Sequence, residues 1–167
     1  LLNVIDDASV DGFNDENDTG ENNDYPYDIN GNLIQDLNKG IISIDYNHLN
    51  LPTKVTFDTG NTLGNDEIRY VYDAIGIKLK KIVVDMSESN GISSMRNTIT
   101  DYSGDYIYEE SRYYTHNGQY WVGYEVGLGL KFFSQPEGYV EPSTTNPNQF
   151  EYVYQYKDHL GNIRLSY

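Results

Sequence analysis

A short turn motif recurs along this chain and constrains its fold more than any other feature. Each copy begins with Asp or Asn and has Gly or Asn three residues later, with aromatic or β-branched residues nearby. The five copies are Tyr27-Asp28-Ile29-Asn30-Gly31, Tyr46-Asn47-His48-Leu49-Asn50, Tyr72-Asp73-Ala74-Ile75-Gly76, Asp101-Tyr102-Ser103-Gly104 and Asp158-His159-Leu160-Gly161. The first copies lie about 20 to 30 residues apart, a spacing that indicates an array of one supersecondary unit.

The chemistry of the motif is that of a hairpin turn. Asp or Asn at the first position accepts hydrogen bonds from backbone amides further along the turn. Gly supplies the positive φ that closes a type I turn with a bulge, and Asn tolerates the same conformation. We therefore expect structural turn roles for ten residues: Asp28, Gly31, Asn47, Asn50, Asp73, Gly76, Asp101, Gly104, Asp158 and Gly161.

The segments between the turns have the pattern of strands. Phe150, Tyr152, Tyr154 and Tyr156 alternate with other residues, which places four aromatic rings on one sheet face. Asn117-Gly118 predicts a further hairpin. No window carries a sustained helical stripe, segment 86–97 is predicted to be a loop, and the prolines at 136, 142 and 147 predict a long loop. The predicted fold is an all-β antiparallel meander of hairpins that forms a strongly curved sheet.

Composition divides the chain into two parts and limits its partners. Residues 1–24 are acidic and polar, which predicts a loop or disordered segment, whereas residues 25–167 form the predicted β-sheet domain. The formal net charge of -15 argues against nucleic acid and anionic membranes as partners. There is no Cys and no apolar run near the ~20 residues that cross a membrane. The first residue is not Met, which suggests a piece of a longer protein.

Four of the motif copies together resemble the Rhs/YD-repeat proteins, in the form found in Bacteroidetes-type surface or secreted proteins. The matching stretches are Tyr27–Leu33, Tyr46–Pro52, Tyr72–Lys80 and Tyr156–Arg164, in combination with Phe132–Tyr139. The last of these resembles the start of the Rhs repeat-associated core. The resemblance covers residues 25–167.

The resemblance implies an architecture rather than an activity. In that family, hairpins join side by side into a sheet that spirals into a hollow shell, which in bacterial members often encloses a toxin domain. This chain has too few repeats to close a shell and stops before the family's self-cleaving segment. We therefore expect a structural segment of a bacterial surface or secreted protein that encapsulates or presents another domain. Its expected partners are flanking repeats, or a further copy joined through the exposed terminal strands.

A self-standing carbohydrate-binding β module is the alternative function. An aromatic cluster could stack on sugar rings if it lay exposed on one sheet face, although aromatic residues at strand spacing are more often part of a core. The cluster is Tyr113, Tyr114, Tyr120, Trp121 and Tyr124. The acidic run at 15–24 loosely matches a calcium loop but lacks the final Glu, so a solvated loop is favoured.

The sequence contains no pattern typical of catalysis. His48, His116 and His159 are scattered without metal-ligand spacing or a nearby Ser or Cys nucleophile. The pairs Glu109-Glu110 and Glu137/Glu141 are more readily explained as solvated charges than as a glycosidase pair. We therefore expect no enzyme activity, no cofactor and no metal.

Overall fold

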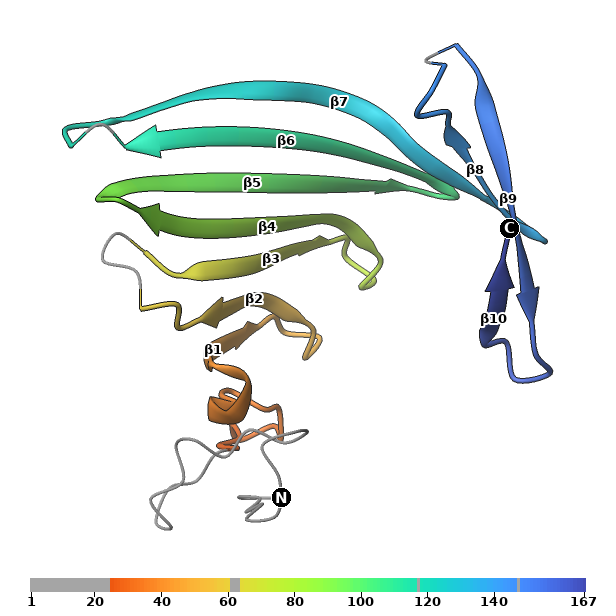
Figure 1. Ribbon diagram of the computed structural model, residues 1–167. Coiled ribbons are helices and arrows are strands. Elements are labelled where there is room, and N and C mark those ends of the chain that lie inside the picture. Colours follow the sequence, from red (N-terminus) through yellow and green to blue (C-terminus); the bar gives the residue numbers. More distant parts are fainter. Residues whose placement is uncertain (1–24, 61–63, 117, 147) are drawn as a thin grey trace, which may run out of the picture.

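The described part of the protein is a ten-stranded antiparallel sheet in which the strands lie side by side in sequence order (Figure 1). The computed structural model describes residues 25–60, 64–116, 118–146 and 148–167, so the prediction for residues 1–24 lies outside the described residues. The strands are β1 (Ile41–Tyr46), β2 (Pro52–Phe57), β3 (Asp66–Tyr72), β4 (Lys78–Ser89), β5 (Ile92–Ser103), β6 (Tyr106–His116), β7 (Trp121–Gln135), β8 (Gly138–Pro142), β9 (Phe150–Lys157) and β10 (Ile163–Ser166). The predicted all-β antiparallel meander is confirmed, with β1 and β10 at the two ends of the strand order in the described residues.

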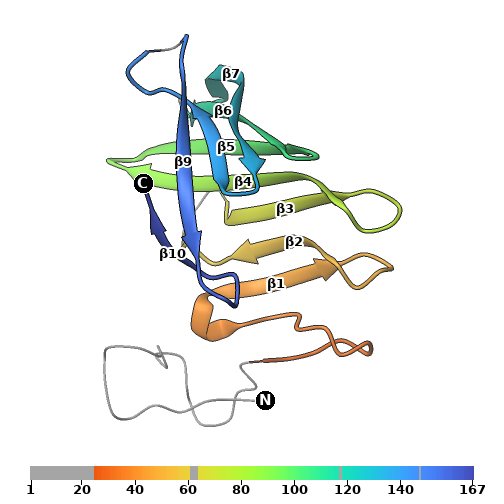
Figure 2. The same ribbon diagram turned by 90° about the vertical axis from the view of Figure 1, so that its right-hand side faces the viewer.

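The sheet bends sharply at β7. Strands β1 to β7 run across the molecule, whereas β8 to β10 turn away from them at one end (Figures 1 and 2). β7 pairs with β6 along most of its length and with β8 only through Phe133, Ser134 and Gln135. The register between β6 and β7 shifts twice, in the part of β7 that holds Gly127 and Gly129. Such bulges increase the local twist, and glycine permits the bend.

No second layer covers the sheet in the described part of the chain. Each strand contacts only its neighbours, except that β1 also contacts η1, a 3-10 turn at Leu37–Lys39. The only buried apolar residues among those described are Tyr25, Val84 and Ile99. The described part of the molecule is therefore a single-layered sheet with almost no enclosed core.

Strand register assigns the side chains to two faces, because residues directly opposite each other in an antiparallel pair share a face. We call one the groove face, and the following cross-strand partners define it: Asp85, Arg96, Tyr113 and Tyr124. The other is the opposite face, defined by Lys54, Arg69, Ile82 and Ile99.

Segment 86–97, predicted to be a loop, instead forms the end of β4, a two-residue turn and the start of β5. Asn90 and Gly91 have φ values of 52° and 73°, the positive values that a type I′ turn requires at both positions. The predicted proline-rich loop is also shorter than expected, since β8 lies between Pro136 and Ser143. Gly118 has a φ of 91° between β6 and β7, while Asn117 lies outside the described residues.

Candidate functional site

Four of the recurring turns are built by the same hydrogen bonds. In each, the amide of the residue with positive φ donates to the backbone oxygen of the first residue, as Gly31 does to Asp28 at 3.1 Å. The side-chain oxygen of the first residue accepts from the amides two and four positions on. In the turn at Asp73, these amides belong to Ile75 and Ile77, at 3.0 and 2.8 Å. The other two copies begin at Asn47 and Asp158.

Position four of the turn needs a positive φ, which the sequence meets with Gly or Asn. Gly31, Gly76 and Gly161 have φ values of 84°, 89° and 84°. Asn50 fills the same position with a φ of 58°, one of two described non-glycine residues with positive φ. The structure thus places Asn47 and Asn50 at the same turn positions as Asp and Gly in the other copies.

Neighbouring turns are tied together by tyrosine hydroxyls. Tyr46, just before the second turn, donates its hydroxyl to the backbone oxygen of Leu33 at 2.6 Å. Tyr72, just before the third, donates in the same way to Pro52 at 3.0 Å. Both acceptors lie five residues after the first residue of the preceding turn, so this bond repeats with the motif. Burial raises the pKa of both tyrosines, so their hydroxyls remain protonated donors to a higher pH than an ordinary tyrosine.

Further contacts stack the turns along one end of the sheet, where Figure 2 shows the β1–β2 and β3–β4 connections one above the other. The side-chain amide of Asn32 donates to Asn50 at 2.9 Å. A Cβ added to Gly76 would lie 3.0 Å from the side chain of Leu51 in the preceding turn. We call this series of linked turns the turn ladder; its members begin at Asp28, Asn47 and Asp73.

The predicted turn at 101–104 requires a correction. Asp101 lies inside β5, opposite Tyr108, and its carboxylate pairs with Lys80 at 2.8 Å. The turn is instead made by the two residues Gly104 and Asp105, between the paired residues Ser103 and Tyr106. Gly104 has a φ of 60°, as a type II′ turn requires at its first position. Gly104 is therefore a turn residue, and Asp101 is not.

Hydrogen bonds also set the charge of two turn carboxylates. The side-chain amide of Asn32, together with backbone amides of the turn, lowers the pKa of Asp28. Desolvation acts to raise the pKa of Asp158, but hydrogen bonds from Asn162 and Arg164 outweigh it, so that this pKa is also lowered. Arg164, which the sequence pattern left without a role, pairs with Asp158 at 2.7 Å. Both carboxylates therefore stay ionised to a lower pH than an ordinary Asp, and the ionised form accepts most hydrogen bonds.

The predicted aromatic platform is divided between the two faces. Tyr113 and Tyr124 lie opposite each other on the groove face, with ring centroids 5.0 Å apart and an interplanar angle of 18°. Trp121 pairs with His116 on the opposite face, where its ring is tilted against the imidazole at 5.2 Å.

Tyr114 also lies on the opposite face, where its ring covers Gly123; a Cβ there would come within 2.4 Å of it. Tyr120 is exposed in the connection before β7. The five aromatic residues therefore do not form one surface.

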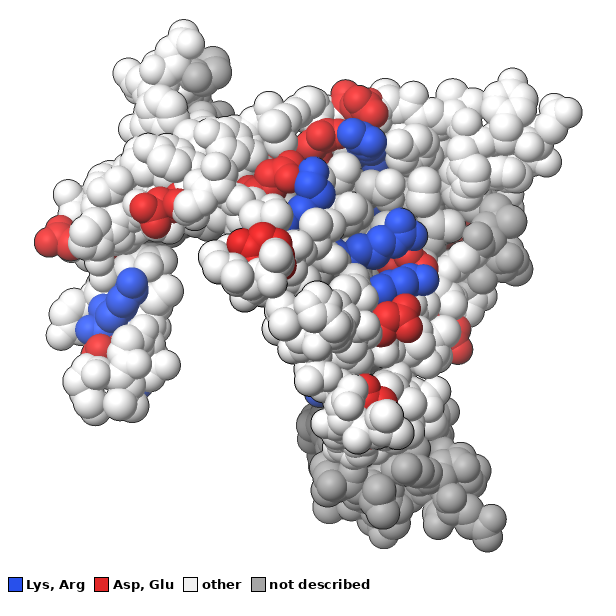
Figure 3. All heavy atoms as spheres, turned by 180° about the vertical axis from the view of Figure 1, so that it is seen from behind, with Lys and Arg blue, Asp and Glu red and all other residues white. Residues whose placement is uncertain are grey.

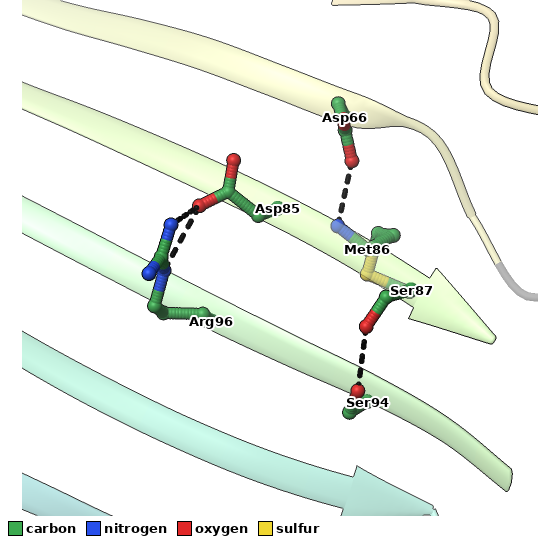
Figure 4. A network of polar contacts seen from close by, with 6 residues as sticks. All are labelled: Asp66, Asp85, Met86, Ser87, Ser94 and Arg96. Atoms are coloured by element: carbon green, nitrogen blue, oxygen red, sulfur yellow. Dashed lines mark hydrogen bonds and ion pairs between the residues drawn. The ribbon is translucent and has the colours of Figure 1, made fainter. Parts of the chain in front are cut away.

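The groove face carries a row of directly opposed residues that sequence reasoning did not find. Asp85, Arg96, Tyr113 and Tyr124 lie opposite one another in turn, from β4 to β7. The guanidinium of Arg96 donates to one oxygen of Asp85 at 2.8 and 3.1 Å (Figure 4).

Beside this row, the hydroxyls of Ser87 and Ser94 are 2.7 Å apart, and Asp66 accepts from the amide of Met86 at 2.6 Å (Figure 4). The row and the two serines line a shallow depression of about 560 Å³. Only the strand register could have revealed this grouping, because its members come from four separate segments.

The opposite face carries a row of ion pairs that crosses the sheet from β2 to β7 (Figure 3). Lys54 pairs with Glu67 at 2.7 Å, and Glu67 also binds Arg69. Further along the row, Lys80 pairs with Asp101. Arg112 pairs with both Glu110 and Glu125. Three of these pairs join neighbouring strands, Lys54 with Glu67, Lys80 with Asp101 and Arg112 with Glu125, and each contributes little because it is partly exposed.

Glu109 and Glu110, weighed as a catalytic pair, lie on different faces of the sheet. Glu109 pairs with Lys131, whereas Glu110 pairs with Arg112 and points to the other face. His116 packs on Trp121. In the described residues, no group of three or more His, Cys, Asp or Glu side chains is placed to hold a metal ion. No helix in this part of the chain is long and apolar enough to cross a membrane.

Comparisons with family models, with characterised proteins and with solved structures found no match to this chain. The resemblance to Rhs/YD-repeat proteins therefore depends on the motifs alone. What the structure itself defines is a class: a single-layered antiparallel sheet whose turns repeat in sequence and in hydrogen bonding.

Proposed function

We propose that this chain is a structural segment of a larger β-wall, which encloses or presents another domain of a bacterial surface or secreted protein. The observation that carries the proposal is the absence of a second layer: each described strand contacts only its sheet neighbours and, for β1, η1. A self-standing binding domain buries a core between layers. A wall built of repeats is stabilised mainly by contacts between neighbouring units.

The turn ladder supports the same function. The first two turns of the ladder are each followed by a carbonyl that accepts the hydroxyl of the next Tyr, at Leu33 for Tyr46 and at Pro52 for Tyr72. A unit of this kind can be added to again where the motif recurs. Flanking repeats of the same kind are therefore the partners that this architecture suits best, in agreement with the Rhs/YD-repeat resemblance.

Hydrogen exchange at β10 tests the proposal. β10 has exposed side chains throughout and lies at the end of the strand order. We expect the coding sequence to continue after Tyr167 into further repeats, and the extended protein to protect the β10 amides at least about 100-fold more than the present chain. β5 amides, paired on both sides, are the internal control. A stop codon directly after Tyr167, or equal exchange of β10 in both proteins, would overturn the proposal.

Carbohydrate binding is a second candidate, and the row on the groove face favours it. Tyr124 offers an exposed ring beside Tyr113, and the Asp85–Arg96 pair and two serines offer hydrogen-bonding groups in the same depression. Sugars bind through such a combination of ring stacking and hydroxyl contacts. On a glycan array, we expect Tyr124→Ala to abolish binding and Trp121→Ala, on the opposite face, to preserve it. A wild-type chain that binds no glycan would exclude this candidate.

A further inference from the structure

The longest unpaired sheet edge in the described part of the chain runs along β7, and not along a strand at either end of the strand order. Between Trp121 and Phe132, β7 pairs with β6 on one side, and β8 begins to pair only at Phe133. Figure 1 shows β7 as the outermost strand of the β1–β7 part of the sheet, with β8 to β10 turned away from it. The backbone groups on this side of β7 therefore lack a strand partner among the described residues, and such an edge is a template for another strand.

Between Trp121 and Val126, before the bulged part of β7, this edge lacks the features that normally prevent pairing. Natural edges are short or carry Lys or Pro. In contrast, Val122, Tyr124 and Val126 share the groove face of β7, and 53%, 64% and 53% of their surfaces are exposed. The only charged residue between Trp121 and Val126 is Glu125, which pairs with Arg112 at 3.2 Å.

We propose that β7 pairs antiparallel with β7 of a second copy of this chain, about a two-fold axis at Tyr124. In this register Tyr124 lies opposite Tyr124 of the second copy, and Val122 lies opposite Val126. All three exposed apolar side chains then have an apolar neighbour across the new strand pair. The stacked Tyr113–Tyr124 pair is extended into a row of four tyrosines on one continuous face.

Charge and backbone geometry select this register over its neighbour. With the axis at Tyr124, Glu125 lies opposite Gly123 of the second copy, so no like charges meet. A shift of the axis to Glu125 places the two Glu125 carboxylates directly opposite each other, which destabilises a strand pair. The regular part of β7 ends near Val126, where its register with β6 shifts. The proposed pairing uses only the regular part, and it does not depend on the proposed wall function.

Sedimentation and light scattering over a range of concentrations test the association. We expect a reversible dimer, and we expect Val126→Lys to weaken it roughly tenfold or more, since Lys is a natural edge-blocking residue. Ile92→Lys is the matched control: Ile92 is 54% exposed but lies in β5, away from the β7 edge. Circular dichroism checks that each variant is folded, and Tyr124→Lys provides a second edge variant.

Disulfide cross-linking tests the register. The natural chain has no Cys, so each single-Cys variant carries only one thiol. Opposed residues of an antiparallel pair are about 4.5 to 5.5 Å apart at Cα, within the range of a disulfide. Tyr124→Cys is therefore expected to cross-link two copies under mild oxidation, and Ile92→Cys is not.

Three results would overturn the proposal. The first is that the chain is a monomer at every concentration. The second is that Val126→Lys leaves the association unchanged. The third is that Leu165→Lys, in β10, abolishes the association while Val126→Lys does not.

Discussion

At the scale of single residues, one side-chain oxygen organises each turn of the ladder. The carboxylate of Asp73 and the amide oxygen of Asn47 each accept from two backbone amides, at distances between 2.8 and 3.0 Å. The acceptor, and not the charge, is common to the two turns. Asp and Asn are therefore interchangeable in the sequence motif for a physical reason.

Replacement of Asp73 separates these two contributions. Asp73→Ala leaves the amides of Ile75 and Ile77 without their acceptor, and we expect a loss of about 1 to 2 kcal/mol in the free energy of unfolding. Asp73→Asn keeps the acceptor and is expected to cost much less. Urea unfolding of both variants measures the difference. Equal losses in the two variants would show that the negative charge is what matters.

The lowered pKa values of Asp28 and Asp158 predict that the folded chain loses stability in acid. Their pKa values are lower in the folded chain than the ordinary value of 3.8. The unfolded chain therefore takes up protons first as the pH falls. The stabilisation is complete above the ordinary pKa and is lost as the pH falls through the lowered folded values.

Unfolding between about pH 6 and pH 2 tests this dependence. The double variant Asp28→Asn, Asp158→Asn keeps the acceptor oxygens but cannot titrate at these positions. We expect its stability to fall less steeply below the ordinary pKa of 3.8 than that of the natural chain. Parallel curves for the two proteins would contradict the prediction.

At the scale of elements, the motif predicted hairpins at five places in the chain, but it misplaced the turn near Asp101. The two-residue turn at Gly104 does not need an acidic first residue, so Asp101 remained free to pair with Lys80 in the middle of the sheet. Spacing alone cannot distinguish these cases.

The sequence pattern also failed to predict the strand ends within residues 86–97, for a different physical reason. Polar residues such as Ser87 and Ser94 occupy strand positions here, and even the buried position 93 is a serine, so the usual alternation of apolar and polar residues is absent. The bend at β7 and the row from Asp85 to Tyr124 depend on register across several strands, which no local pattern contains.

Gly138 fixes the position of the strands that follow the bend. A Cβ at this residue would lie 1.9 Å from the backbone oxygen of Val153 in β9. Gly138→Ala must therefore displace β8 from β9, at a cost of about 1 to 3 kcal/mol.

Gly129→Ala is the matched control, because a Cβ there has no atom within 4 Å. Faster hydrogen exchange of β9 in the Gly138 variant alone is the expected result. If Gly129→Ala has the same effect, close packing at Gly138 is not the cause.

At the scale of the whole molecule, the free energy of folding is spread unevenly along the sheet. The buried residues Val84 and Ile99 lie in β4 and β5, and these strands have paired neighbours on both sides. β9 and β10 carry mostly exposed side chains. The middle of the sheet is therefore expected to be the most stable part.

Native-state hydrogen exchange measures this gradient. We expect the amides of β4 to β6 to exchange only through global unfolding, and those of β9 and β10 to exchange through local opening at lower free energy. Addition of a low concentration of urea is expected to accelerate the central strands more than the terminal ones. Uniform protection from β1 to β10 would show that the sheet opens as one unit.

The tyrosine bonds of the turn ladder also have a direction. Tyr46 reaches back to Leu33, and Tyr72 reaches back to Pro52, so each donor is synthesised after its acceptor. A chain that leaves the ribosome from its N-terminus can therefore lock each new hairpin onto one that is already folded. The repeat therefore carries its own order of assembly, because each new hairpin finds its acceptor carbonyl in a segment that has already been made.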